Sequence, residues 1–107
     1  IFELSGRLSE GQGGQVGALV LPSGQRIVLG EYSLSIGRLP ECTTTLADTN
    51  VSRQHAEIRP AGTGFELVDL DSTNGTFVNG VRIRQHMLDD GDIISFGGTI
   101  KIAFEAR

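Results

Sequence analysis

The feature that most constrains this fold is a series of short apolar or alternating segments, each bounded by Gly, Asp, Asn or Pro. No segment of useful length shows the 3.6-residue period of an amphipathic helix. Residues 100–104 are the clearest strand, because Ile100, Ile102 and Phe104 would share one face of an extended chain. Fifteen glycines in 107 residues supply many tight turns. The pattern predicts an all-β sandwich or barrel.

Other segments also have the length and composition of strands. They are residues 18–21, 26–29, 34–36, 55–59, 65–70, 76–78 and 93–96. Turn-forming sequences lie between several of them. Pro22-Ser23-Gly24 fits a short hairpin, Asn79-Gly80 tolerates the positive φ of a two-residue turn, and Asp90-Gly91 forms a turn before residue 93. The chain length fits one folded domain.

The first residues differ in composition from the rest. The stretch SEGQGGQVG at 9–17 is polar and rich in glycine, so we expect a flexible leader or linker at residues 1–16 and the folded domain at residues 17–107. The chain begins at Ile1 without a signal-like segment, which indicates a fragment. No apolar run approaches the roughly 20 residues needed to span a membrane.

Charge and cysteine content limit the partners and the location. A net charge of −4 argues against nonspecific nucleic-acid binding, which depends on a basic face. We therefore expect a protein partner, not nucleic acid or membrane, and a monomeric module. The single Cys42 cannot form an internal disulfide, which fits a cytoplasmic, reducing location and a small, partly buried role.

Three polar clusters lie at the ends of predicted strands, at residues 37–38, 52–55 and 72–76. Loops at one rim of a sandwich converge in space. The clusters contain two guanidinium groups, several hydroxyls and an amide, but no metal-ligand set. Because the planar arginine fork makes paired, charge-assisted bonds to a tetrahedral oxyanion, the clusters predict a phosphate-binding surface.

Metal chemistry fits the sequence less well. Residues 69–73 resemble the first half of a calcium loop, but Asn74 stands where glycine is needed and Gly80 where a bidentate Glu belongs. The aspartates at 89, 90 and 92 fit a turn around Gly91 better than paired catalytic carboxylates. We expect neither a metal nor a cofactor.

Ser52 and His55 invite a second alternative, a nucleophile with its base. Neither an acid partner nor a nucleophile elbow accompanies them, so we do not expect an enzyme. Strand alternation groups His55 with Glu57 and Arg59, which predicts that its side chain lies outside the core.

Four segments taken in order resemble one known family. They read IGR at 36–38, VSRQHAEI at 51–58, DLDSTNGTFVNG at 69–80 and LDDGDIISFG at 88–97. Together they resemble a forkhead-associated (FHA) domain from about Gly17 to Phe104. The resemblance implies a β-sandwich of about eleven strands whose apical loops bind phosphothreonine. It also implies a docking module in Ser/Thr kinase signalling, with a phosphorylated protein, the kinase or its substrate as partner.

The resemblance assigns roles by position. Arg38 would bind the phosphate through its guanidinium, and Ser52 would donate its hydroxyl to another phosphate oxygen. Arg53 would add a backbone or side-chain contact to the phosphate. Thr73 would contact the phosphate and shape the slot for the phosphothreonine methyl.

Other positions would bind the peptide or support the loops. Asn74 resembles the amide that binds the peptide main chain, and Asn50 would contact the peptide beside it. His55 would connect the binding loops by hydrogen bonds, with Gly37 and Gly75 supporting the turns. The alternative function is a phosphate-independent scaffold that docks a neighbouring domain or forms an oligomer.

Overall fold

The computed structural model describes residues 16–98 and 100–107, and this part of the chain forms eleven strands and no helix. The all-β prediction is therefore confirmed. The strands are β2 (Gly17–Val20), β3 (Arg26–Val28), β4 (Leu34–Gly37), β5 (Thr44–Thr45), β6 (Ala56–Ala61), β7 (Gly64–Asp69), β8 (Thr76–Val78), β9 (Val81–Ile83), β10 (Gln85–Met87), β11 (Ile93–Phe96) and β12 (Ile100–Ala106). The predicted leader, residues 1–16, lies outside the described residues except for Val16, whose backbone pairs with that of Arg107.

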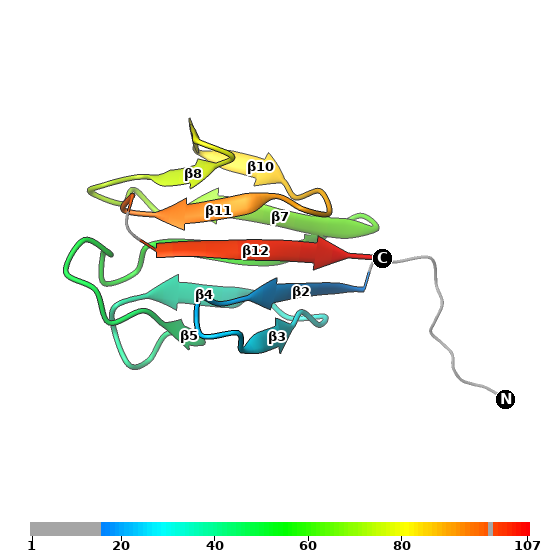
Figure 1. The fold of residues 1–107 in the computed structure, drawn as a ribbon, viewed down its shortest axis with the longest axis horizontal. Helices are drawn as coiled ribbons and strands as arrows, with labels where there is room; N and C mark the ends of the chain where they lie inside the picture. Colours follow the sequence, from blue (N-terminus) through cyan, green and yellow to red (C-terminus); the bar gives the residue numbers. More distant parts are fainter. Residues whose placement is uncertain (1–15, 99) are drawn as a thin grey trace, which may run out of the picture.

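The strands form two sheets that pack face to face as a sandwich (Figure 1). One sheet has the order β10-β7-β6-β4-β5, and the other has the order β3-β2-β12-β11-β8-β9. Neighbouring strands are antiparallel except for β4 and β5, which pair in parallel. The chain passes from one sheet to the other several times, so segments far apart in sequence meet at the two ends of the sandwich.

The core lies between the sheets and follows the alternation of the strands. Ile94 and Phe96 of β11 are fully buried, whereas Ile93 is 39% exposed. Ile102 and Phe104 of β12 are also fully buried, and the ring of Phe104 contacts that of Phe65 edge to face. The remaining buried core side chains are Leu19, Leu29, Leu34, Ile36, Leu46, Val51, Ala56, Ile58, Leu67, Val78 and Leu88. Their burial supplies the main favourable term for folding.

Most predicted strands match the structure to within about two residues at each end, whereas β5, β9 and β10 were not predicted. The two-residue β5 is too short to show alternation. The turn before β9 is of the predicted two-residue type, with a φ of 51° at Asn79 and 85° at Gly80. Strands β9 and β10 are sheet edges with mostly exposed side chains, so they carry little apolar signal.

The predicted site loops lie together at one end of the sandwich. Strands β4 and β11 end there, and β6, β8 and β12 begin there, at the left of Figure 1. The C-terminus lies at the opposite end. The alternating strand directions therefore bring the three polar clusters to one rim.

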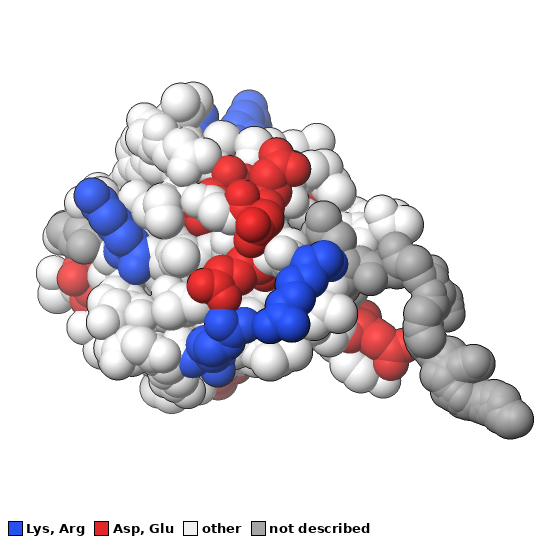
Figure 2. Space-filling model, turned by 45° about the vertical axis from the view of Figure 1, so that its right-hand side comes forward, with Lys and Arg blue, Asp and Glu red and all other residues white. Residues whose placement is uncertain are grey.

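Most of the face in Figure 2 is uncharged, with a band of acidic groups near its centre and basic groups at the left, below the band and at the top. Two arginine–glutamate ion pairs connect strands among the described residues: Arg26 on β3 reaches across β2 to Glu105 on β12, and Arg59 on β6 pairs with Glu66 on the neighbouring β7. Exposed pairs of this kind contribute about 0–1 kcal/mol each. Within the described residues, no helix has the length and hydropathy to cross a bilayer.

Removing a buried β12 side chain should destabilise the sandwich strongly. Ile102→Ala leaves a cavity between the sheets and is expected to lower the free energy of unfolding by about 2–5 kcal/mol. Val28→Ala is the matched control, because Val28 lies on the edge strand β3 and is 70% exposed. Its expected cost is about 0.5 kcal/mol or less. Urea unfolding followed by circular dichroism would measure both, and similar losses would contradict this description of the core.

Candidate functional site

The end of β4 pairs with the segment before β6 outside the regular sheet ladder. The backbone N–H of Arg38 donates to the carbonyl of Ser52 at 3.0 Å, and that of Leu39 donates to Arg53 at 3.3 Å. On the other side, the N–H of His55 donates to the carbonyl of Ile36 at 2.9 Å. Two of the predicted polar clusters are therefore joined through their main chains.

Gly37 permits this pairing because the segment after β4 and the segment before β6 approach each other closely. A Cβ atom at Gly37 would lie 2.1 Å from the carbonyl oxygen of Arg53 and 2.9 Å from the Sγ of Cys42. The Cys42 thiol also faces this carbonyl, with Sγ 3.4 Å from the oxygen. Cys42 is buried, so it packs beneath the loops as a small side chain.

His55 is fully buried, so the exposed position predicted from strand alternation is wrong. The reason is that β6 begins at Ala56, which leaves His55 on the preceding loop and free to turn inward. Its Nδ1 accepts a hydrogen bond from the backbone N–H of Ser52 at 3.0 Å, and its Nε2 lies 2.9 Å from the carbonyl of Gly75. An accepting Nδ1 fixes the tautomer in which Nε2 carries the proton and donates to Gly75.

Ser52 connects the second cluster to the third. Its Oγ accepts a hydrogen bond from the backbone N–H of Thr73 at 3.0 Å, which leaves the hydroxyl proton available to an external acceptor. His55 bonds to the backbone nitrogen of Ser52 and not to its hydroxyl. Both ring nitrogens of His55 are thus engaged by main-chain groups, and the geometry differs from that of a nucleophile and its base.

Asp69, at the end of β7, organises the third cluster and was not among the predicted site residues. Its carboxylate accepts hydrogen bonds from the hydroxyls of Ser72 and Thr76 and from the N–H of Ser72. The Ser72 hydroxyl oxygen also accepts from the N–H of Gly75 at 3.1 Å. Burial alone would raise the pKa of Asp69, but these hydrogen bonds together lower it below the ordinary value. The DxxS spacing is the sequence signal that could have revealed this turn.

Asn50 and Asn74 face each other across the loops. The side-chain Nδ2 of Asn74 donates to the main-chain carbonyl of Asn50 at 2.9 Å. The N–H of Asn50 is in turn bonded to the carboxylate of Asp48 at 2.8 Å. The backbone of Gly97, at the end of β11, donates to the carbonyl of Gly75 at 3.1 Å and packs against Asn50. Asn74 therefore contacts the Asn50 loop with its amide nitrogen.

Two arginines lie at the surface of these loops. Arg38 is exposed, and its Nε donates to the carbonyl of Val51 at 3.2 Å, which directs the guanidinium along the loop before Ser52. Arg53 is also exposed. Within residues 16–98 and 100–107, neither makes an ion pair. The structure thus brings Arg38, Ser52, Arg53 and Thr73 to one rim with unpaired cationic charge.

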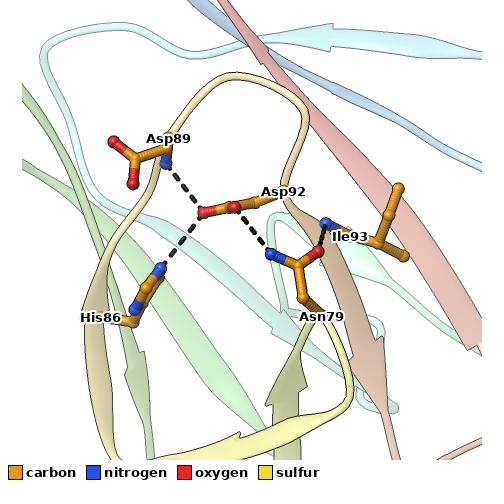
Figure 3. Close-up of polar contacts among 5 residues, drawn as sticks. All are labelled: Asn79, His86, Asp89, Asp92 and Ile93. Carbon is orange, nitrogen blue, oxygen red and sulfur yellow. Dashed lines mark hydrogen bonds and ion pairs between the residues drawn. The ribbon is translucent and has the colours of Figure 1, made fainter.

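Another group of polar side chains, outside the three clusters of the predicted site, surrounds Asp92 in the turn before β11 (Figure 3). Asp92 is buried, and its carboxylate accepts hydrogen bonds from the Asn79 amide and from the N–H of Asp89, while Nε2 of His86 lies 3.2 Å away. Burial alone would raise the pKa of Asp92, but these partners together lower it. The cluster joins β10 to the β8–β9 turn and the start of β11, so the predicted turn role of Asp92 includes a contact between the sheets.

Comparison with known families decides the identity of this fold. A sequence profile described as the FHA domain matches residues 34–97, which include β4 through β11 and every loop of the site. The chain belongs to the FHA domain family. The resemblance inferred from the four sequence segments is therefore confirmed.

Curated relatives of this FHA domain include proteins of Mycobacterium tuberculosis and Mycolicibacterium smegmatis. FhaA, an FHA domain-containing protein of Mycobacterium tuberculosis, is 47% identical over 75 residues, covering 70% of this chain and 14% of FhaA. The glycogen accumulation regulator GarA of Mycolicibacterium smegmatis is 40% identical over 75 residues, covering 70% of this chain and 48% of GarA. The chain thus spans less than half the length of either protein.

A solved FHA domain has the same architecture. It was studied for phosphothreonine-dependent FHA domain interactions and is 41% identical to this chain. The two superpose with a TM-score of 0.78, covering 84% of this chain and 95% of the solved one. The eleven-stranded sandwich predicted from the family resemblance is therefore confirmed.

Substituting Gly37 should disturb this FHA domain far more than substituting another glycine. Gly37→Ala forces a Cβ against the Arg53 carbonyl, so it should separate the paired loops and lower the free energy of unfolding by about 1–3 kcal/mol. Gly30→Ala is the control, because a Cβ there would meet no atom within 4 Å. Thermal unfolding would measure both variants. A neutral Gly37→Ala would contradict the close approach.

The lowered pKa of Asp69 makes part of the domain's stability depend on pH. A carboxylate whose folded-state pKa is below its unfolded value contributes stability that is present above the unfolded pKa, ordinarily 3.8, and is lost as the pH falls through the folded pKa. The stability difference between wild type and Asp69→Asn should therefore be largest near neutral pH and shrink below about pH 4. Denaturant titrations at pH 7, 5 and 3 would measure it, with Glu31→Gln as an exposed control. A stability difference that does not change with pH would contradict a lowered pKa of Asp69 in the folded domain.

Proposed function

We propose that this FHA domain is a phosphothreonine-dependent interaction module that docks phosphorylated partner proteins in Ser/Thr kinase signalling. The observation that carries the proposal is the bond from the Thr73 N–H to the Ser52 Oγ. It fixes the Ser52 oxygen while leaving its proton free, at the rim where the loop after β4 carries Arg38 and the loop before β6 carries Arg53. A hydroxyl donor next to two cationic side chains is suited to a phosphate dianion.

Each phosphate-binding residue has a distinct proposed task. Arg38 would donate from its terminal guanidinium nitrogens, since its Nε is already bonded to the main chain. Ser52 would donate its hydroxyl to a second phosphate oxygen. Arg53, which is exposed, would add positive charge at the rim. Thr73 would contact the phosphate and the phosphothreonine methyl from the opposite loop.

The peptide main chain would bind beside the phosphate. The Asn74 amide nitrogen is bonded to the Asn50 carbonyl, which orients its side-chain oxygen and leaves that oxygen as an acceptor for a peptide N–H. Asn50 itself is exposed on the facing loop and would contact the peptide from there. His55, Gly37 and Gly75 would support these loops from below without touching the ligand.

We propose a binding module and not an enzyme, because His55 is engaged by the Ser52 backbone and the Gly75 carbonyl and cannot also activate the Ser52 hydroxyl. A folded domain over residues 17–107, a flexible leader before it and a monomeric state complete the proposal. A cytoplasmic location fits both a kinase-dependent partner and a reduced Cys42 thiol. The partner would be the kinase or one of its substrates.

Removing the Arg38 guanidinium should abolish most phosphopeptide binding. Charge-assisted hydrogen bonds contribute about 1.5–3 kcal/mol each, so Arg38→Ala should weaken binding about tenfold to a hundredfold for each bond lost. Arg59→Ala is the matched control, because Arg59 is an exposed arginine paired with Glu66 on the sheet. Isothermal titration with a phosphothreonine peptide and its unphosphorylated form would measure the change.

Two outcomes would overturn the proposed function. Equal binding of the phosphorylated and unphosphorylated peptides would favour the phosphate-independent scaffold. Unchanged phosphopeptide binding by Arg38→Ala, with both variants folded, would show that the phosphate is bound elsewhere.

A further inference from the structure

A second surface with exposed arginines borders the loop that contains Thr73. It is an open hollow of ≈ 500 Å³, which we call the arginine hollow, lined by Asp69, Asp71, Ser72, Arg82, Ile83 and Arg84. Arg82 lies on the edge strand β9, and Arg84 lies between β9 and β10. Both arginines are exposed. The hollow is thus lined by two exposed arginines that are close in sequence.

The arginines of the hollow form no ion pair within the described part of the chain. Arg26 and Arg59 each form an ion pair with a glutamate on another strand, whereas Arg82 and Arg84 form none among residues 16–98 and 100–107. The chain as a whole carries a net charge of −4. Two adjacent unpaired arginines on an acidic protein indicate a local site for negative charge.

The hollow is continuous with the proposed phosphate-binding loop. A Cβ at Gly75 would lie 2.9 Å from the Nε of Arg82, so the guanidinium packs directly on the Gly75 backbone. Ser72, on the hollow's wall, immediately precedes Thr73, whose N–H bonds to Ser52. Each residue of an extended chain spans about 3.3 Å, so residues two to four positions from a bound phosphothreonine would reach about 7–13 Å from it.

The acidic groups of the hollow have different roles. The Asp69 carboxylate is directed at Ser72 and Thr76 and accepts their hydroxyl protons, so it is engaged within the loop. Asp71 is exposed and has a positive φ of 56°. Its charge remains in the hollow and would oppose an acidic ligand.

We propose that the arginine hollow binds an acidic side chain of the phosphorylated partner, two to four residues from the phosphothreonine. This inference rests on the proposed function and adds a specificity site to it. The phosphate loops would decide whether a partner binds, and Arg82 and Arg84 would favour partners with Asp or Glu at a nearby position. Their guanidinium groups are suited to carboxylates because the planar fork can make paired bonds.

The test uses three phosphothreonine peptides, one with neutral flanks, one with glutamates two to four residues before the phosphothreonine, and one with glutamates two to four residues after it. One acidic peptide should bind the wild type about threefold to tenfold more tightly than the neutral peptide, as expected for exposed charge pairs. In the double variant Arg82→Gln/Arg84→Gln, the ratio of the affinity for the acidic peptide to the affinity for the neutral peptide should fall to about one. Arg59→Gln is the matched control and should keep the ratio.

Two further variants separate charge from structure. Arg84→Gln alone should lower the ratio, and it removes no contact to Gly75. Asp71→Asn should raise the ratio, because it removes the opposing charge and asparagine tolerates a positive φ. In the wild type and in Asp71→Asn, the ratio of affinities for the acidic and the neutral peptide should decrease in high salt.

The outcomes distinguish this proposal from the function on which it rests. If no phosphothreonine peptide binds the wild type, the proposed function fails. If the neutral peptide binds and neither acidic peptide gains affinity, only the arginine hollow fails. A gain that survives in Arg82→Gln/Arg84→Gln, or that disappears equally in Arg59→Gln, would also overturn it.

Discussion

The loops of this domain depend on one buried imidazole. His55 accepts a hydrogen bond from the Ser52 N–H and donates one to the Gly75 carbonyl, and these two groups belong to different loops. Its ring also packs edge to face on Phe96, with the ring centroids 5.4 Å apart. A buried polar atom without a hydrogen-bond partner costs about 1–3 kcal/mol. Moving either loop would leave one ring nitrogen of His55 unpaired, so burial of the ring favours the conformation in which both loops are in place. The position of the Ser52 hydroxyl and of the Thr73 N–H follows from this constraint.

Two aspartates, the partly buried Asp69 and the buried Asp92, stabilise turns in a similar way. Asp69 accepts three hydrogen bonds from its own turn, and Asp92 connects the β8–β9 turn to the start of β11. Loop segments lack the regular hydrogen bonds between strands of a sheet. In both turns a carboxylate accepts hydrogen bonds from donors that would otherwise be unpaired. Because these donors stabilise the ionised carboxylates, they lower the pKa of both groups, and protonation of the carboxylates in acid removes this contribution to stability.

The sequence predicted the sandwich well where a strand has one apolar face. Ile100, Ile102 and Phe104 alternate clearly because only one face of β12 packs against the core. Strands β9 and β10 lie at sheet edges, where few side chains are buried, and they were missed for that reason. Strand alternation alone would leave His55 outside the core, because alternation holds only within a strand and β6 begins one residue later, whereas the family resemblance predicted a supporting role in the loops. Asp69 was missed because its role depends on hydrogen bonds to a turn that periodicity does not describe.

An ordered set of loops changes what a ligand must contribute to binding. A flexible loop loses conformational entropy when it binds, whereas Ser52 and Thr73 are already bonded to each other, and Asn74 to Asn50. Under the proposed function, a few charge-assisted bonds to one phosphate would therefore supply most of the affinity, whatever the partner's sequence. Such a site discriminates poorly between phosphorylated partners, because the phosphate is the same in all of them. Discrimination has to come from side chains beside the loops, and Arg82, which packs on Gly75, lies next to the ordered loop without being part of it.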